Sequence, residues 1–192
     1  PDCPNLLLTG PTGVGKSTLV ELLLQRLSDA DPSQQHLYLN GHLSRSRGVI
    51  TERIRPFLRT EFNSSAPPII VIDQLDGLVK SAHAALHAIM STTEPECRII
   101  ACTTAPEAVP SRLQSLFARY DLTPINRTDI ATRLSTIATE EDLTLTTKAM
   151  QALARNASGD LRQAINSLQA VAAADGLIGL DDVNEISNAV PQ

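Results

Sequence analysis

The sequence predicts an α/β protein in which helices cover both faces of a parallel sheet and a small all-helical domain follows. The first observation is that short apolar runs alternate with longer amphipathic stretches up to about residue 123, as in strand–helix–strand units. The second is that residues 124–192 contain helical stretches with no strand between them. We therefore expect a sheet-containing domain over 1–123 and a helical domain over 124–192.

Strands are expected where apolar residues stand together in runs too short for a helix. These runs are 5–9, 36–40, 68–73, 97–104 and a shorter one within 118–124. Helices are expected over 18–27, 49–62 and 81–90. The first should carry its leucines on one side, and Pro56 should kink or restart the second. The leucines of that side are Leu19, Leu22, Leu23 and Leu27.

Three helices are expected in the second domain, over 127–143, 146–158 and 159–176. Their expected starts carry residues that cap helices well. These starts are Thr128 or Asp129, Thr146, and 158–160. Gly176 is the expected end of the third helix.

The composition narrows the function classes. A formal net charge of −5 argues against a generally basic nucleic-acid-binding protein, although a local basic strip is compatible with it. No apolar run approaches the length of a membrane span, and no signal peptide is expected. Three cysteines without framework spacing indicate a reducing compartment, so we expect the nucleus in a eukaryote and otherwise the cytoplasm.

The stretch GPTGVGKS, residues 10–17, fits the pattern G-x-x-x-x-G-K-[ST] between an expected strand and an expected helix. Backbone N–H groups and a helix N-terminus there supply positive potential to phosphate oxygens. Lys16 is expected to reach the β- and γ-phosphates, and Ser17 to ligate Mg²⁺. The sequence thus predicts a P-loop NTPase that binds ATP or ADP. Its expected nucleotide-binding residues are Gly10, Pro11, Thr12, Gly13, Val14, Gly15, Lys16, Ser17 and Thr18.

The stretch VIDQLD, residues 71–76, ends an apolar strand in a carboxylate. Asp73 is expected to hold Mg²⁺ directly or through water, and Asp76 to be a turn or cap residue. Gln74 stands where nucleotide-hydrolysing enzymes often carry Glu. A glutamine can hydrogen-bond a water but cannot take its proton. The stretch therefore predicts a nucleotide site with weak intrinsic hydrolysis.

Four stretches together resemble the AAA+ ATPases of the clamp-loader group, above all the small subunits of replication factor C. They are the phosphate loop, VIDQLD, LNGHLSRSRG at 39–48 and GDLRQAIN at 159–166, and the last narrows the resemblance to this group. The resemblance covers essentially the whole chain and implies an AAA+ core followed by a helical lid. It also implies a partial module, short before its first strand and ending where a helical collar would begin.

The resemblance implies further roles. Arg162 would be the sensor-2 arginine that reaches the γ-phosphate from the lid, coupling lid closure to the nucleotide. Thr103 and Thr104 stand at the sensor-1 position, where the family usually carries Asn. The arginine-finger position aligns with Leu116. The finger candidates are then Arg119 and Arg112.

The implied partners are sister AAA+ subunits, a sliding clamp and primed DNA, with no membrane. Residues before two expected helices are candidates for contacts with the DNA backbone, which carry no sequence information. They are Ser44, Arg45, Arg47 and Lys80. An ordinary solvated loop is the alternative interpretation of these residues.

His83 and His87 stand four residues apart on an expected helix, a spacing compatible with metal binding. Because no third ligand is evident, we expect them on a solvated face. Cys97 and Cys102 belong to an expected buried strand, so core packing is favoured over zinc binding.

The phosphate loop predicts ATP binding, and the resemblance implies a subunit of a sliding-clamp loader that acts in DNA replication or repair. A first alternative is a non-hydrolysing subunit that holds or senses nucleotide as a structural element. A second alternative is another AAA+ DNA-processing protein, such as an origin-recognition or checkpoint clamp-loader subunit.

Overall fold

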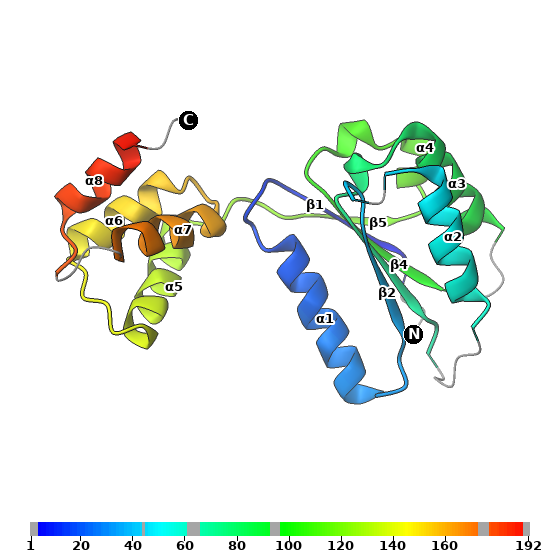
Figure 1. Ribbon diagram of the computed structural model, residues 1–192, viewed down its shortest axis with the longest axis horizontal. Helices are drawn as coiled ribbons and strands as arrows, with labels where there is room; N and C mark the ends of the chain where they lie inside the picture. Colours follow the sequence, from blue (N-terminus) through cyan, green and yellow to red (C-terminus); the bar gives the residue numbers. More distant parts are fainter. Residues whose placement is uncertain (1–3, 44, 61–65, 93–96, 173–176, 190–192) are drawn as a thin grey trace. The chain divides into compact units, whose positions relative to one another are not determined.

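The computed structural model describes residues 4–43, 45–60, 66–92, 97–172 and 177–189 (Figure 1). The chain forms two compact units. The first unit comprises 1–10 and 16–122 and contains the sheet. The second comprises 11–15 and 123–192 and contains a helical bundle.

Five parallel strands form the sheet, in the order β2-β3-β4-β1-β5. Their bounds are β1 Leu6–Thr9, β2 His36–Asn40, β3 Ile69–Asp73, β4 Arg98–Thr103 and β5 Ala118–Asp121. The expected parallel sheet is confirmed, including its short fifth strand. Because all strands run the same way, their carboxyl ends meet at one edge, where ligands bind in open α/β sheets. Thr9, Asp73 and Thr103 end three of these strands.

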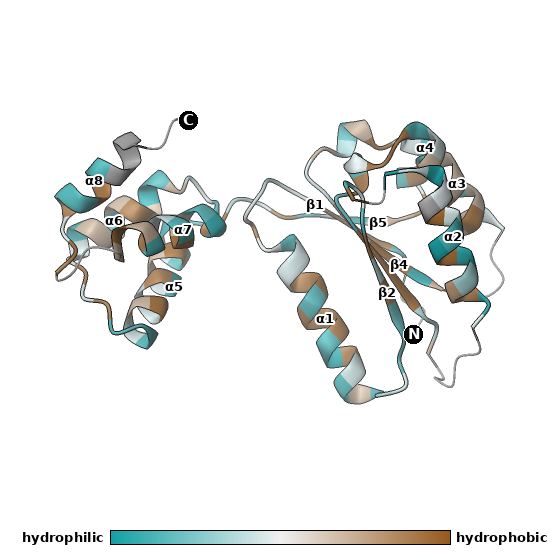
Figure 2. Ribbon diagram, viewed as in Figure 1, coloured by the Kyte–Doolittle hydropathy of each residue, from teal (hydrophilic) through white to brown (hydrophobic). Residues whose placement is uncertain are grey.

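Helices cover both faces of the sheet, as expected (Figure 1). They are α1 Lys16–Ala30 on one face, and α2 Arg47–Leu58, α3 Lys80–Ser91 and the short α4 Ser111–Gln114 on the other. Two short 3₁₀ turns, η1 Leu75–Gly77 and η2 Pro106–Ala108, follow β3 and β4. Buried apolar residues of the strands and of these helices form one cluster on each face of the sheet. Hydrophobic and hydrophilic segments alternate along α1 (Figure 2).

The side of α1 that packs on the sheet differs from the leucine side expected from sequence. Val20 and Leu24 are buried against the strands, while Leu22 is 53% exposed. Leu19 and Leu27 are also exposed. The buried residues follow steps of four along the helix, which makes a narrow stripe. The apolar periodicity predicted this helix correctly, but it did not predict that Val20 and Leu24 are the residues that pack on the sheet.

Helix α2 begins two residues before the expected position and includes Pro56 near its end. It does not restart after Pro56, since Leu58 is its last residue. A proline in the last turn removes only one helical hydrogen bond, and the Arg59 N–H still reaches the Arg55 carbonyl at 3.2 Å. The expected extension to residue 62 runs into residues 61–65, which lie outside the described part.

In the described part of the second unit, four helices form a bundle, one more than expected. They are α5 Arg127–Glu140, α6 Thr147–Asn156, α7 Leu161–Ala172 and α8 Leu180–Ala189. The missed helix α8 places Val183 in the same apolar core as Ile130, Leu153 and Leu168. Its sequence carries several acidic and amide residues, which weakened its apolar pattern. The expected stop at Gly176 lies outside the described residues.

Capping side chains define where these helices begin. Thr146 caps α6 as expected, accepting the Ala149 N–H at 3.2 Å. Helix α5 is capped by Asn126, whose side-chain oxygen accepts the Asp129 N–H at 2.8 Å, so the expected start at Thr128 or Asp129 was wrong by two to three residues.

Within the described residues, no helix has the length and apolar character required to span a membrane.

Candidate functional site

The phosphate loop joins the end of β1 to the start of α1, as the sequence predicted. Gly13 and Gly15 adopt positive φ angles of 66° and 92°. Residues with a Cβ rarely adopt these conformations, so glycine lets the loop turn at both points. Gly10 and Gly15 are the fixed glycines of the motif, and Gly10 also has a positive φ, of 143°, so both fixed positions favour glycine for a backbone reason.

Lys16 is the first residue of α1 and is only 8% exposed. Its Nζ donates a hydrogen bond to the Gly10 carbonyl at 2.7 Å. The ammonium group therefore lies over the start of the phosphate loop. At a helix N-terminus this charge adds to the positive potential that attracts a phosphate.

Ser17 and Asp73 lie side by side at the carboxyl edge of the sheet. The Ser17 hydroxyl donates to Asp73 Oδ2 at 2.9 Å, joining α1 to the end of β3. A hydroxyl and a carboxylate are hard oxygen ligands, the type that Mg²⁺ prefers. The donor set therefore fits the Mg²⁺ of a bound nucleotide. No cluster of three His, Cys, Asp or Glu side chains forms a separate metal site in the described part of the chain.

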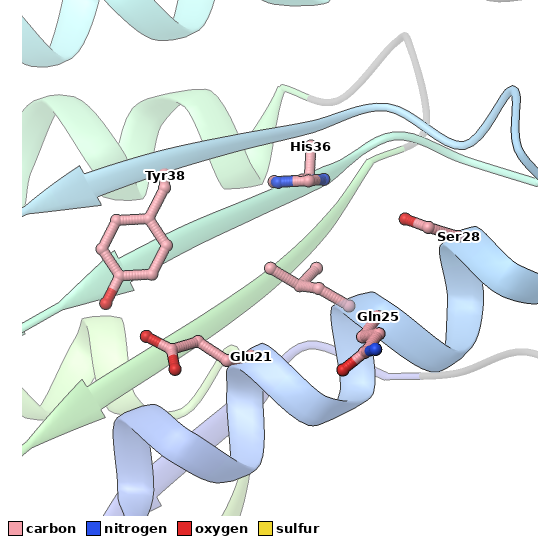
Figure 3. Close-up of a pocket in the computed structure, with 6 residues that line it drawn as sticks. Glu21, Gln25, Ser28, His36 and Tyr38 are labelled. Carbon is pink, nitrogen blue, oxygen red and sulfur yellow. The ribbon is translucent and has the colours of Figure 1, made fainter.

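Tyr38 is a member of this site that the sequence reading missed. Tyr38 lies on the edge strand β2, and its hydroxyl donates a hydrogen bond to Asp73 Oδ2 at 2.9 Å. It also borders an open hollow of about 460 Å³ between α1 and β2 (Figure 3). The contact depends on the pairing of β2 with β3. The sequence shows two strands that each precede a polar turn, but it does not show that they pair.

Gln74, at the expected catalytic position, has a left-handed backbone with φ 57° and ψ 55°. Its N–H donates to Asp73 Oδ1 at 2.9 Å, and its carbonyl accepts the Gly77 N–H at 2.9 Å. A Cβ on Gly41 would lie 2.0 Å from the same carbonyl oxygen. The peptide is therefore held closely, while the Gln74 side chain is exposed.

Asp76 connects the turn after β3 to the end of β4. Its carboxylate accepts hydrogen bonds from the Thr103 hydroxyl and, at 3.3 Å, from the Thr104 N–H. Thr103 is buried, and its hydroxyl oxygen also accepts the Ala105 N–H at 3.1 Å. Asp76 thus orients the sensor-1 candidates, a role that the expected turn or cap assignment did not include. The Thr104 residue is exposed.

Cys102 lies one residue before the end of β4, facing the same side of the sheet as Val71. Burial, and then the nearby Asp73 carboxylate, raise the pKa of its thiol to about 12. Burial also raises the pKa of Cys97. Both residues are buried among apolar side chains, which confirms the expected core packing.

The tip of the phosphate loop, residues 11–15, belongs by its contacts to the helical unit. Within that unit, the Thr12 hydroxyl donates to Asp160 Oδ2 at 3.0 Å. The Leu161 N–H donates to the Gly13 carbonyl at 3.1 Å. Asp160 also caps α7 by accepting the Gln163 N–H at 2.9 Å. The start of α7 therefore holds the loop tip by two hydrogen bonds.

Arg162 is the second residue of α7 and is exposed. It follows the loop-binding residues Asp160 and Leu161 directly in the chain. Its sensor-2 role stays a prediction, because this role concerns a nucleotide that the structure does not contain.

The finger candidates occupy different surroundings. Arg119 lies on β5 and pairs with Asp121, with 2.7 Å between Arg119 Nε and Asp121 Oδ1. The Thr9 hydroxyl, and then Arg119, lower the pKa of Asp121. Arg112 is exposed on α4, whereas Leu116 packs against the main core. The aligned finger position is thus an apolar packing position in this chain.

The candidate DNA-contact residues described by the structure gather at two helix starts. Arg47 and Lys80 are the first residues of α2 and α3. The Arg45 carbonyl accepts the Val79 N–H at 3.1 Å, which brings the loop before α2 to the start of α3. Ser44 lies outside the described residues.

The expectation of a solvated face for both histidines was wrong for His83. Only 3% of His83 is exposed, and its Nε2 lies 2.9 Å from the Leu75 carbonyl. This bond joins α3 to the turn after Asp73. A histidine can satisfy a buried carbonyl in this way, and spacing alone does not reveal it. His87 is half-buried, with Nδ1 3.5 Å from Ser91 Oγ.

Comparison with known families agrees with this geometry. The model of the ATPase family associated with various cellular activities (AAA) matches residues 6–124. The chain belongs to the AAA family of ATPases. Membership of this family implies that the AAA chain binds a nucleotide. A second model, described as an RFC1-like AAA+ ATPase lid domain, matches residues 127–185, which include helices α5 to α7.

Curated relatives of this AAA chain include replication factor C small subunits of archaea. The Haloarcula marismortui protein is 34% identical over 88% of this chain and 52% of its own length. The Staphylothermus marinus protein is 32% identical over 95% of this chain and 56% of its own length. This chain thus spans just over half the length of these curated relatives.

Solved structures show the same fold. The RuvB Holliday junction branch migration motor of Thermotoga maritima superposes with a TM-score of 0.74 at 20% identity. The match covers 97% of this chain and 62% of that one. At this identity the likeness extends to the fold alone, which supports the AAA+ core and helical lid.

Proposed function

We propose that this chain is the ATP-binding core and lid of a sliding-clamp loader subunit that acts in DNA replication or repair. The observation that carries the proposal is the lid over 127–185, which matches an RFC1-like lid model. The similarity to replication factor C small subunits over most of this chain supports it. Such a subunit works where DNA is replicated, in the nucleus of a eukaryote and otherwise in the cytoplasm.

The proposed ligand is ATP with Mg²⁺. Lys16 and the loop backbone bind the phosphates, and Ser17 and Asp73 hold the metal. Bound Mg²⁺ neutralises phosphate charge and orients the phosphate chain. Arg162 reads the γ-phosphate from the helical unit, next to the residues that hold the loop tip.

The proposed partners are sister AAA+ subunits, a sliding clamp and primed DNA. Arg45, Arg47 and Lys80 lie at two helix starts that a backbone hydrogen bond brings together. Helix N-termini and basic side chains both attract phosphates. We therefore place the contact with the DNA backbone at these two helix starts.

A reconstitution experiment tests this proposal. The full-length protein is assembled with the clamp-loader subunits and the clamp of its own organism, and ATP-dependent clamp loading on primed DNA is measured. We expect loading to require this subunit and to fall when Arg45, Arg47 and Lys80 are changed together to Ala. Loading that proceeds equally without this protein would rule the proposal out.

A second candidate function, a subunit that binds ATP without hydrolysing it, is supported by Gln74. This side chain cannot accept a proton from water, and Leu116 occupies the aligned finger position. The two candidates differ in steady-state ATP turnover. The test compares turnover of the wild type and of Gln74→Glu, each with and without primed DNA.

We expect very slow turnover by the wild type and a gain of at least about 100-fold for Gln74→Glu, which is the lower end of typical general-base effects. Gln151→Glu, on an exposed position of α6, is the matched control for the added charge. Brisk turnover by the wild-type chain alone would show that Gln74 does not limit hydrolysis.

A further inference from the structure

The carboxylate of Asp73 is held by donors from three separate segments. The hydroxyls of Ser17 and Tyr38 both donate to Oδ2 at 2.9 Å. The Gln74 N–H donates to Oδ1 at 2.9 Å. Ser17 belongs to α1, Tyr38 to β2, and Gln74 to the turn after β3. Of these donors, the Tyr38 hydroxyl has no role in the nucleotide chemistry described above.

The sheet register explains how Tyr38 reaches Asp73. Tyr38 pairs with Val71, and Asn40 pairs with Asp73 in the parallel ladder. Side chains two residues apart on a strand share a face, so Tyr38 and Asp73 both point toward α1. Val71 packs on that face with residues of α1, which confirms the direction. A phenol is long enough to extend along the strand to the carboxylate two positions further.

The Tyr38 hydroxyl acts only as a hydrogen-bond donor in this environment. Burial, the hydrogen bond to Asp73 and the charges of Asp73 and Glu21 all raise the pKa of Tyr38. Glu21 lies beside the ring on α1 (Figure 3). The geometry itself makes the Tyr38 hydroxyl a hydrogen-bond donor to Asp73 Oδ2.

We propose that Tyr38 is a positioning residue for the magnesium–nucleotide site, because its hydroxyl fixes the orientation in which Asp73 acts with Ser17. The inference rests on the Mg²⁺-dependent nucleotide binding proposed above and not on clamp loading. A carboxylate held by fixed donors meets the metal with less loss of side-chain freedom than a mobile one. The structural alternative is that the Tyr38 ring only covers the hollow between α1 and β2.

Tyr38→Phe separates these two roles, since it keeps the ring and removes only the hydroxyl. The wild type and the variant are titrated with a fluorescent ATP analogue in EDTA and at increasing Mg²⁺ concentrations. We expect equal affinities in EDTA and an increase of about 3- to 10-fold in the Mg²⁺ concentration that gives half of the metal-dependent gain, the size of one hydrogen bond. Spectra of bound Mn²⁺, a substitute for Mg²⁺, should also change in Tyr38→Phe.

Tyr120→Phe is the matched control, because Tyr120 is the other tyrosine and lies 56% exposed on β5. It should leave the Mg²⁺ requirement unchanged. Urea unfolding of each variant without nucleotide reports any effect on folding. An unchanged Mg²⁺ requirement in Tyr38→Phe overturns the inference, and so does an equal loss of affinity in EDTA. A wild type whose nucleotide binding ignores Mg²⁺ overturns the proposed metal site as well.

Discussion

Ser17 and Asp73, 56 residues apart in the chain, share a hydrogen bond of 2.9 Å between Ser17 Oγ and Asp73 Oδ2. The bond joins the first turn of α1 to the last residue of β3. It brings into contact two residues that were identified separately from sequence motifs. Because the bond links a hydroxyl to a carboxylate, it is of the stronger, charge-assisted kind.

Ser17→Ala and Asp73→Asn should each weaken ATP binding in the presence of Mg²⁺ by about 10- to 100-fold. This range corresponds to about 1.5–3 kcal/mol for a hydrogen bond to a charged group. The double variant should lose less than the sum of the two losses, because residues in contact are not additive. Calorimetric titration of the four proteins measures the coupling.

Ser135→Ala, on an exposed position of α5, is the control for removing a serine hydroxyl. It should bind Mg·ATP as the wild type does. Strictly additive losses in the double variant would mean that Ser17 and Asp73 act on the nucleotide independently.

Gly13→Ala should destabilise the protein more than Gly15→Ala. Both glycines have positive φ, so each alanine carries a backbone cost of about 1–2 kcal/mol. At Gly13 the new Cβ would also lie 1.7 Å from Asp160 Oδ1, whereas at Gly15 no atom of the described residues lies within 4 Å of it. Urea unfolding of the two variants, without nucleotide, compares the two costs directly.

Asp160→Ser identifies the source of the extra cost. Serine is shorter than aspartate and still provides a capping oxygen for α7. Added to Gly13→Ala, this change should recover part of the lost stability. If the Gly13→Ala and Gly15→Ala variants unfold at the same urea concentration, the contact with Asp160 carries no cost.

The parts of the site that could be predicted from sequence are those that lie in short, continuous sequence motifs. The phosphate loop is one continuous motif, and Asp73 ends a continuous apolar strand. Tyr38 could not be found in this way, because its contact with Asp73 depends on the pairing of β2 with β3. The sheet class was predicted by alternation of strands and helices, but strand order comes from tertiary packing.

The predictions for His83 and for the leucine side of α1 were wrong for the same reason. Sequence spacing does not tell which side of a helix is buried. His83 has the spacing of an exposed metal ligand, yet it lies under the turn after β3 and contacts the Leu75 carbonyl. Leu22 belongs to an apolar helix side, yet the sheet covers the stripe of Val20 and Leu24 instead. Periodicity gives the polarity of a helix side but not the width of the surface that covers it.

Gln74→Gly should stabilise the protein by about 0.5–1 kcal/mol. Gln74 has φ 57°, a conformation that costs a non-glycine residue about 1–2 kcal/mol, and the extra backbone freedom of glycine offsets part of the gain. Gln151→Gly in the exposed interior of α6 should have the opposite sign, a loss of about 1 kcal/mol. Urea unfolding measures both, and a loss of stability in Gln74→Gly would show that its side chain is needed.

The thiol of Cys102 should resist modification in the folded protein. Its pKa of about 12 leaves on the order of one thiolate in ten thousand at pH 8, and the residue is buried. Cys97 should behave in the same way, because burial raises its pKa too. Colorimetric thiol titration at pH 8, with Cys3 changed to serine, should find no fast-reacting thiol without urea and two in urea.

The raised pKa of Cys102 also determines how the free energy of unfolding changes at alkaline pH. Because the folded pKa of Cys102 lies above its ordinary value of 9.0, the unfolded state loses the thiol proton first as pH rises. The contribution to stability is therefore complete below pH 9 and is lost as pH rises from 9 toward 12. Cys102→Ala should show a shallower decline of unfolding free energy over this window than the wild type. Identical slopes in the two proteins would mean that the Cys102 thiol ionises as readily when folded as when unfolded.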